Sequence, residues 1–114
     1  MMLDWNKYRR QVTAGVGEIG HLSPDIVRGY MALSASGTKK NLLGAKVREL
    51  IALAVAVTAR CDGCITVHTD AAIKHGATQD EVAEALGVAI AVNAGAALVY
   101  STRVMDAYKS HGAA

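Results

Sequence analysis

Both cysteines of this chain lie within the four residues Cys61-Asp-Gly-Cys64, and a histidine, His68, follows four residues later. On a helix that begins near Cys61, positions 61, 64 and 68 share one face. A thiol in a first helical turn meets the positive end of the helix dipole and unpaired N–H groups, and both favour the reactive thiolate. His68 lies one turn beyond Cys64 and can accept its proton. The spacing therefore predicts a redox-active dithiol.

Three other uses of the cysteine pair stay open on the residues alone. A structural disulfide closing so short a loop would stabilise the fold by only about 2 kcal/mol, and a reducing compartment disfavours it. Unreactive buried cysteines are common, although the polar Asp62-Gly63 between this pair indicates an exposed turn. A zinc ion needs further ligands, and His75 would lie about 20 Å along the helix from Cys61. A zinc site would therefore have to be shared between subunits.

The elements that position these residues are expected to be helices, because nothing in the sequence alternates as a half-buried strand does. Ser23-Pro24 and the capping box Thr78-x-x-Glu81 mark helix starts, and Gly76 marks a helix end. We predict a single all-α domain over residues 1–114, a bundle of about six helices. Their expected ranges are a first helix capped by Asp4, then 24–35, 45–60, 61–75, one from 79 through Ile90, and 95–108.

Composition and charge limit the partners. The net charge of +2 arises from interspersed residues and forms no nucleic-acid footprint. The amino terminus has no apolar region after its positive charges, so a secretory signal is not expected and the cytoplasm is the default compartment. The apolar runs at 50–59 and 85–100 are shorter than the roughly 20 residues of a membrane span, so no membrane partner is expected.

A homo-oligomer is expected from the apolar content. Hydrophobic residues make up 52% of the chain, with no Phe and one Trp, so small side chains must form the core. The helix at 45–60 is apolar nearly all round and is expected to be buried. With the small-residue run from Val88 to Tyr100, such a chain carries more apolar surface than one subunit buries.

A larger pattern is specific to one family. Glu49 precedes Cys61, Cys64 and His68 at a set spacing, and the run "AAIKHGATQDEVAEALGVAI" and a late "AALVY" follow. Over roughly residues 20 to 108 the chain resembles the AhpD-like, or carboxymuconolactone decarboxylase, family. The resemblance implies an all-helical subunit, assembly into homotrimers or homohexamers, and thiol peroxidase chemistry on small hydroperoxides without a cofactor or a metal.

The resemblance also implies a role for each residue of the site. Cys64 would be the attacking thiol and Cys61 the resolving thiol, while Glu49 and His68 would relay the proton. These roles need the helices on either side of the cysteines to fold back as an antiparallel hairpin, which would bring Glu49 close to His68. Helix-terminus arguments alone favour Cys61 as the first attacker, whereas proximity to His68 favours Cys64. An external dithiol, on a lipoyl- or thioredoxin-like protein, would regenerate the thiols.

Two features separate this chain from other branches of the family. The best-studied branch carries a further histidine between the cysteines, where this chain has Gly63. The decarboxylase branch generally lacks the cysteine pair, so decarboxylation of a lactone is not the chemistry that these residues indicate. Besides the peroxidase, we keep two hypotheses of other classes: a helical oligomer whose dithiol senses redox state, and a zinc-binding structural module.

Overall fold

The computed structural model describes residues 1–112 and consists there of five α-helices without a strand. The all-α fold is confirmed, with five helices in place of about six. The helix predicted to start after Thr78 and the one predicted at 95–108 are a single continuous helix. The helices are α1 (Trp5–Leu22), α2 (Pro24–Ser34), α3 (Ala45–Ala59), α4 (Asp62–Lys74) and α5 (Gln79–Ser110).

The continuity of α5 has a simple cause. Gly95 is the residue at which a new helix was expected to begin, yet a glycine inside a helix costs only about 1 kcal/mol relative to alanine. The residues around it are mostly alanine, valine and leucine without a proline, and the one side chain that could cap a new helix, Asn93, donates instead to Thr58 Oγ1 and to the Ala89 carbonyl. Without a stop signal, the backbone hydrogen bonds continue through this position, and α5 reaches 32 residues.

The other helix boundaries follow the predicted signals. The Asp4 side chain accepts a hydrogen bond from the Lys7 N–H at 3.2 Å and caps α1. Pro24 occupies the first turn of α2. Thr78 and Glu81 exchange both hydrogen bonds of the predicted capping box at the start of α5. Gly76 has φ +87°, a left-handed conformation that ends the α4 segment.

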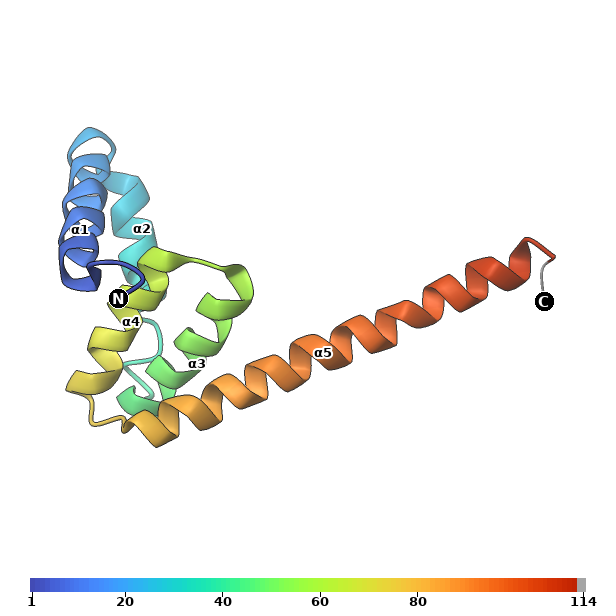
Figure 1. Cartoon of the computed structure of the whole chain (residues 1–114). Coiled ribbons are helices and arrows are strands. Elements are labelled where there is room, and N and C mark those ends of the chain that lie inside the picture. The colour runs from blue at the N-terminus through green and yellow to red at the C-terminus, as the bar shows by residue number, and fades with distance from the viewer. Residues whose placement is uncertain (113–114) are drawn as a thin grey trace.

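The helices form two hairpins and one projecting arm (Figure 1). α3 and α4 pack against each other as the predicted antiparallel pair, and α1 and α2 form a second pair that meets α4 through α1. α5 packs along α3 with its first half. Its second half leaves the body of the molecule and carries the C-terminal end far from the N-terminus. The chain extends 58 Å along its longest axis.

The core of one chain is small. Among residues 1–112 only four apolar side chains and one polar side chain are buried: Leu53, Ala56, Ala72, Ala89 and Thr66. The prediction that the helix at 45–60 is buried is wrong for the single chain. α3 packs on α4 and α5 with part of its surface only, and Ile51 and Val55 remain 49% and 60% exposed.

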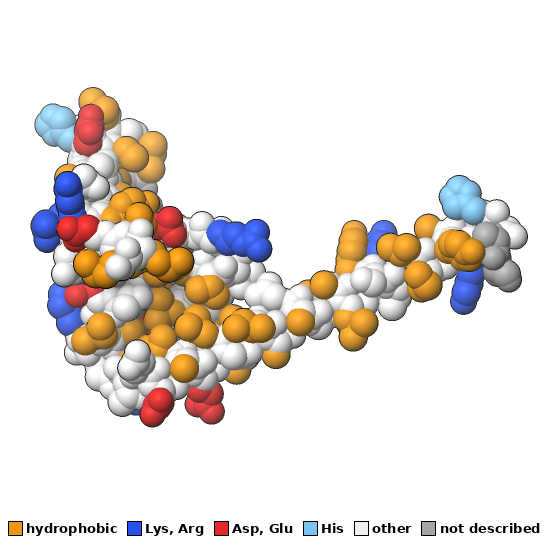
Figure 2. All heavy atoms as spheres, in the orientation of Figure 1, with side chains coloured by type: hydrophobic (Ala, Val, Ile, Leu, Met, Phe, Trp, Pro, Cys, Tyr) orange, Lys and Arg blue, Asp and Glu red, His pale blue; other side chains and the backbone are white. Residues whose placement is uncertain are grey.

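α5 presents apolar side chains along its length (Figure 2). By length and composition alone, the uninterrupted helix could span a membrane. Only 6% of its most apolar 18-residue segment is buried within the chain. The apolar run at 85–100 was predicted to be too short to span a membrane. Because the helices expected at 79–90 and 95–108 form one helix, length no longer argues against a span. The contacts of α5 with α3 must therefore decide whether protein or lipid covers its exposed surface.

An ion pair joins α3 to the start of α5. The Lys46 ammonium donates to Glu81 Oε2 at 2.7 Å, and the same carboxylate closes the capping box through Thr78. The hydrogen bond from Lys46, followed by that from the Thr78 backbone, lowers the pKa of Glu81 from 4.5 to about 2. A carboxyl whose pKa is lower in the folded chain stabilises the fold above its ordinary pKa, and that contribution disappears as the pH falls toward the folded value.

We expect Glu81→Gln to lower the thermal unfolding temperature at pH 7, and the difference from the parent to shrink between pH 4.5 and about 2, where the parent carboxyl also becomes neutral. Circular dichroism melts across this pH range measure the difference. Glu84→Gln, on the exposed side of the same helix, is the matched control and should show no such dependence. A Glu81→Gln difference that stays constant from pH 7 to pH 2 would contradict the assignment.

Candidate functional site

The turn that carries the cysteines is built by a left-handed residue. α3 ends at Ala59, and its C-cap residue Arg60 has φ 56° and ψ 51°, which reverse the chain direction. The Cys61 N–H then donates to the Ala56 carbonyl at 3.1 Å and fixes the reversal. Cys61 is extended and serves as the N-cap of α4. The sequence predicted a helix start at or just after Cys61, and α4 begins at Asp62.

The two cysteines are joined as the disulfide Cys61–Cys64, with their Cα atoms 5.2 Å apart. The Cys64 backbone N–H donates to Cys61 Sγ at 3.1 Å, so this sulfur caps the helix as a Ser or Asp oxygen commonly does. An N–H donor and the positive end of the helix dipole favour negative charge on the sulfur when the bond is opened. Both cysteines are partly exposed.

Glu49 and His68 meet across the α3–α4 hairpin. His68 Nδ1 lies 2.7 Å from Glu49 Oε2, and the two side chains are 25% and 22% exposed. An ionised carboxylate only accepts hydrogen bonds, so beside an ionised Glu49 the ring donates Nδ1–H, and in the neutral ring of that tautomer Nε2 is the nitrogen free to accept a proton. His68 lies one helical turn beyond Cys64 on the same face of α4. The approach of Glu49 to His68 expected from the hairpin is present.

Contacts that the sequence did not signal hold the other side of α4. The buried Thr66 donates its hydroxyl hydrogen bond to the Trp5 carbonyl at 3.0 Å, and these residues are 61 positions apart. The Arg9 guanidinium lies 3.8 Å from Asp70. α4 is thus fixed between α3, which carries Glu49, and α1. No motif or spacing links residues 5 and 9 to residues 66 and 70, so this support could not be found from the sequence.

Gly63 lies where another branch of the family carries a histidine, and α1 covers this position. A Cβ added to Gly63 would meet the two methyl groups of Val12 at 3.5 and 3.6 Å, which is ordinary contact. A small side chain therefore fits, whereas an imidazole would have to displace Val12 or turn past it.

The residues weighed as zinc ligands do not converge in the part of the chain that the structure describes. No group of three or more His, Cys, Asp or Glu side chains within residues 1–112 is arranged to hold a metal ion. His75 lies at the C-cap of α4, at the end opposite to the cysteines. This position agrees with its reading as a side chain at a helix C-terminus.

Known proteins with similar sequences and structures were compared with the chain. Residues 24–107 match the carboxymuconolactone decarboxylase family. An uncharacterised protein of Haemophilus influenzae is 50% identical over 108 residues, which cover 95% of this chain and 96% of the relative. An uncharacterised protein of Cupriavidus necator is 30% identical over 105 residues, which cover 92% of this chain and 93% of the relative. The crystal structure of apo-lpg0406, a carboxymuconolactone decarboxylase family protein from Legionella pneumophila, superimposes with a TM-score of 0.74 at 30% identity, covering 93% of this chain and 95% of that one.

The chain is all-helical over residues 1–112, carries a cysteine pair at the turn of a helix hairpin, and matches one family over residues 24–107. The chain belongs to the carboxymuconolactone decarboxylase, or AhpD-like, family. Within it, the chain carries the Cys-x-x-Cys pair, which confirms the resemblance drawn from Glu49, Cys61, Cys64 and His68.

Proposed function

We propose that the protein is a thiol-dependent peroxidase, or dithiol–disulfide oxidoreductase, that reduces small hydroperoxides through Cys61 and Cys64. The observation that carries the proposal is the 2.7 Å contact between Glu49 and His68, one helical turn from a formed Cys61–Cys64 disulfide. A structural cysteine pair has no need of a carboxylate–imidazole pair beside it. In a thiol enzyme such a pair supplies the base that takes the proton of the thiol.

The first step is ionisation of Cys64. Glu49 accepts the Nδ1 hydrogen of His68 and orients the ring, so that Nε2 takes the Cys64 proton. The thiolate attacks the terminal oxygen of the hydroperoxide. A sulfur–oxygen bond forms and the oxygen–oxygen bond breaks, and the released alkoxide takes the proton from His68 to become an alcohol. Cys64 is then a sulfenic acid.

The second step closes the disulfide. The Cys61 sulfur attacks the sulfenic sulfur of Cys64, a sulfur–sulfur bond forms, and hydroxide leaves as water after taking the Cys61 proton. The two Cα atoms are 5.2 Å apart, within the range that a disulfide requires. Overall, the dithiol supplies two electrons and two protons, and the hydroperoxide becomes an alcohol and water.

An external dithiol returns the site to its reduced form. The partial exposure of both cysteines allows a thiolate on a lipoyl- or thioredoxin-like partner to attack Cys64. Cys61 then leaves as a thiolate, and the N–H of Cys64 and the start of α4 stabilise the charge. The partner becomes a disulfide in the same exchange. This cycle suits a reducing compartment, and we place the protein in the cytoplasm.

Single-turnover oxidation of the reduced protein by a small alkyl hydroperoxide tests the site. We expect Cys64→Ser to abolish rapid oxidation, and Cys61→Ser to react once and stop at a trappable sulfenic acid. Glu49→Gln and His68→Gln should each slow the reaction by roughly 100-fold, and the double variant should be little slower than either, because the two residues act as one unit. Stopped-flow measurement with Glu84→Gln as the control variant gives these rates.

Three results would overturn this account or part of it. Equal oxidation rates for Glu49→Gln and the Glu84→Gln control would show that Glu49 takes no part in a proton relay. Rapid oxidation of Cys64→Ser, with sulfenic acid trapped on Cys61, would reverse the roles of the cysteines. Disulfide formation without turnover in the presence of a dithiol reductant would favour the redox-sensing oligomer over the enzyme.

We further propose that copies of the chain cover the exposed surface of α5. The accessible surface is 8835 Å², whereas a compact monomer of 11.9 kDa exposes roughly 5,900 Å². The radius of gyration is 18.9 Å, against roughly 13 Å for a compact chain of this length. The excess is several times the roughly 800 Å² that one partner buries in a standard interface. Two or more neighbours per subunit, as in a homotrimer or homohexamer, account for it.

Lipid is a poorer cover for α5 than protein. The first half of the apolar stretch packs on α3, and the Asn93 side chain donates to Thr58 Oγ1 at 2.8 Å across that contact. A membrane around α5 would take α3 into the hydrocarbon region together with its polar residues Glu49 and Arg48. A second copy covers the projecting half without that cost.

One side of the projecting half of α5 contains Leu98, Val104, Met105 and Tyr108, each more than half exposed. We expect Val104→Asp to dissociate the oligomer, because the carboxylate would be buried without a partner. Val99→Asp is the matched control, since Val99 is similarly exposed but lies beside Asp106 on the other side of the helix. Light scattering on detergent-free protein measures the mass. A monomeric parent, or association with lipid vesicles in its place, would contradict the proposal.

A further inference from the structure

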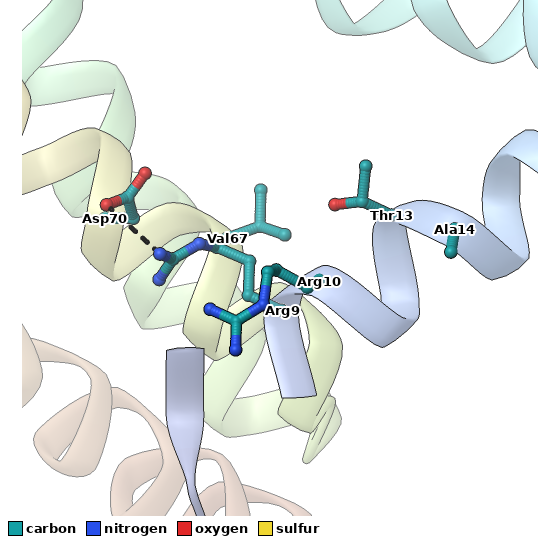
Figure 3. A pocket seen from close by; sticks show the side chains of 6 residues that line it. All are labelled: Arg9, Arg10, Thr13, Ala14, Val67 and Asp70. Carbon is teal, nitrogen blue, oxygen red and sulfur yellow. Dashed lines mark ion pairs between the residues drawn. The ribbon is translucent and has the colours of Figure 1, made fainter. Parts of the chain in front are cut away.

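A cavity lies between α1 and α4, beside the face of α4 that carries the cysteines. It measures about 510 Å³ and separates α1 from α4 (Figure 3). α1 contributes Arg9, Arg10, Thr13 and Ala14, and α4 contributes Val67 and Asp70. Asp70 follows His68 by two residues, which places the two side chains on nearly opposite faces of the helix. None of Glu49, Cys61, Cys64 and His68 lines the cavity, although Val67 is adjacent to His68 and α4 forms one wall of both sites.

Cations outnumber anions around this cavity. Asp70 is the one carboxylate in its lining, and it is already engaged on both oxygens: Lys74 Nζ lies 2.8 Å from Oδ2 and Arg9 Nη2 lies 3.8 Å from Oδ1. The hydrogen bond from Lys74, and then the charge of Arg9, lower the pKa of Asp70, so the carboxylate stays ionised. Within residues 1–112 the Arg10 guanidinium makes no ion pair. Positive charge thus remains uncompensated at the cavity wall.

An apolar extension adjoins the charged cavity. A neighbouring cavity of about 370 Å³ shares Arg9 and Asp70 with the first one, so the two adjoin each other between α1 and α4 at the Arg9–Asp70 ion pair. Its lining includes Trp5, Ile65 and Ile73. A ligand that fills both would combine an anionic end with an apolar body.

We propose that the groove formed by these two cavities binds a small organic acid, with its carboxylate on Arg9 and Arg10 and its apolar body along Trp5, Ile65 and Ile73. Paired guanidinium donors suit the two oxygens of a carboxylate, and charge-assisted hydrogen bonds of this kind are the stronger ones. The combined volume is in the range of small-molecule sites. Asp70 opposes the ligand carboxylate, and its engagement by Lys74 and Arg9 reduces that repulsion.

The single tryptophan makes occupancy of the groove measurable, because Trp5 lines its apolar part. Titration of the intact oligomer with hexanoate should change Trp5 fluorescence in a saturable way, with calorimetry giving the same dissociation constant. We expect Arg10→Gln to weaken hexanoate binding by about tenfold through loss of one charge-assisted contact. Arg10 has no partner within residues 1–112 to lose, so this variant should fold as the parent does, which its circular dichroism melt checks.

The controls test separately the ligand's carboxylate, its apolar body and the net charge of the protein. Lys7→Gln removes an equal charge from α1 outside both cavities and should leave the affinity unchanged. Hexan-1-ol lacks the carboxylate, and inorganic phosphate lacks the apolar body, so each should bind at least about tenfold more weakly than hexanoate. Hexanoate binding that is absent, equal to that of hexan-1-ol or phosphate, or insensitive to Arg10→Gln would overturn the proposal.

Discussion

The contact between Glu49 and His68 is the interaction on which the proposed chemistry depends. It joins the two arms of the α3–α4 hairpin at 2.7 Å, and with Nδ1 turned to the carboxylate it leaves Nε2 as the nitrogen that the proposed mechanism uses as a base. The turn between the arms places Cys61 at the N-cap of α4 and Cys64 one turn before His68. The hairpin therefore assembles acid, base and sulfur pair from residues only 19 positions apart.

A second constraint is the shortage of core within one chain. Five buried side chains among residues 1–112 are few for a stable domain, and α5 leaves its second half uncovered. Because α3 carries Glu49 and also packs against α5, the stability of the redox hairpin is linked to whatever covers these helices. Assembly of several copies would thus support the same helix that orients the proton relay.

Much of the site was predictable because it is local. Capping signals at Asp4, Thr78 and Gly76, and the spacing of the cysteines and His68, depend on neighbours within one or two turns. The continuity of α5 was missed since the cost of Gly95 is small against the helix-forming residues around it. The support of α4 by α1, through Thr66 and the Trp5 carbonyl, joins distant residues and leaves no periodic signal in the sequence. Burial of α3 was misjudged because its apolar surface exceeds what its own chain covers.

The most direct test of the central claim is the product formed when the fully reduced protein receives one equivalent of a small alkyl hydroperoxide. Mass spectrometry of the digested protein, with free thiols alkylated, identifies the state of each sulfur. The account predicts one Cys61–Cys64 disulfide and one alcohol for each hydroperoxide consumed. Two alkylated thiols beside unreacted hydroperoxide would show that the Glu49–His68 pair does not activate the sulfur next to it, and would contradict the account.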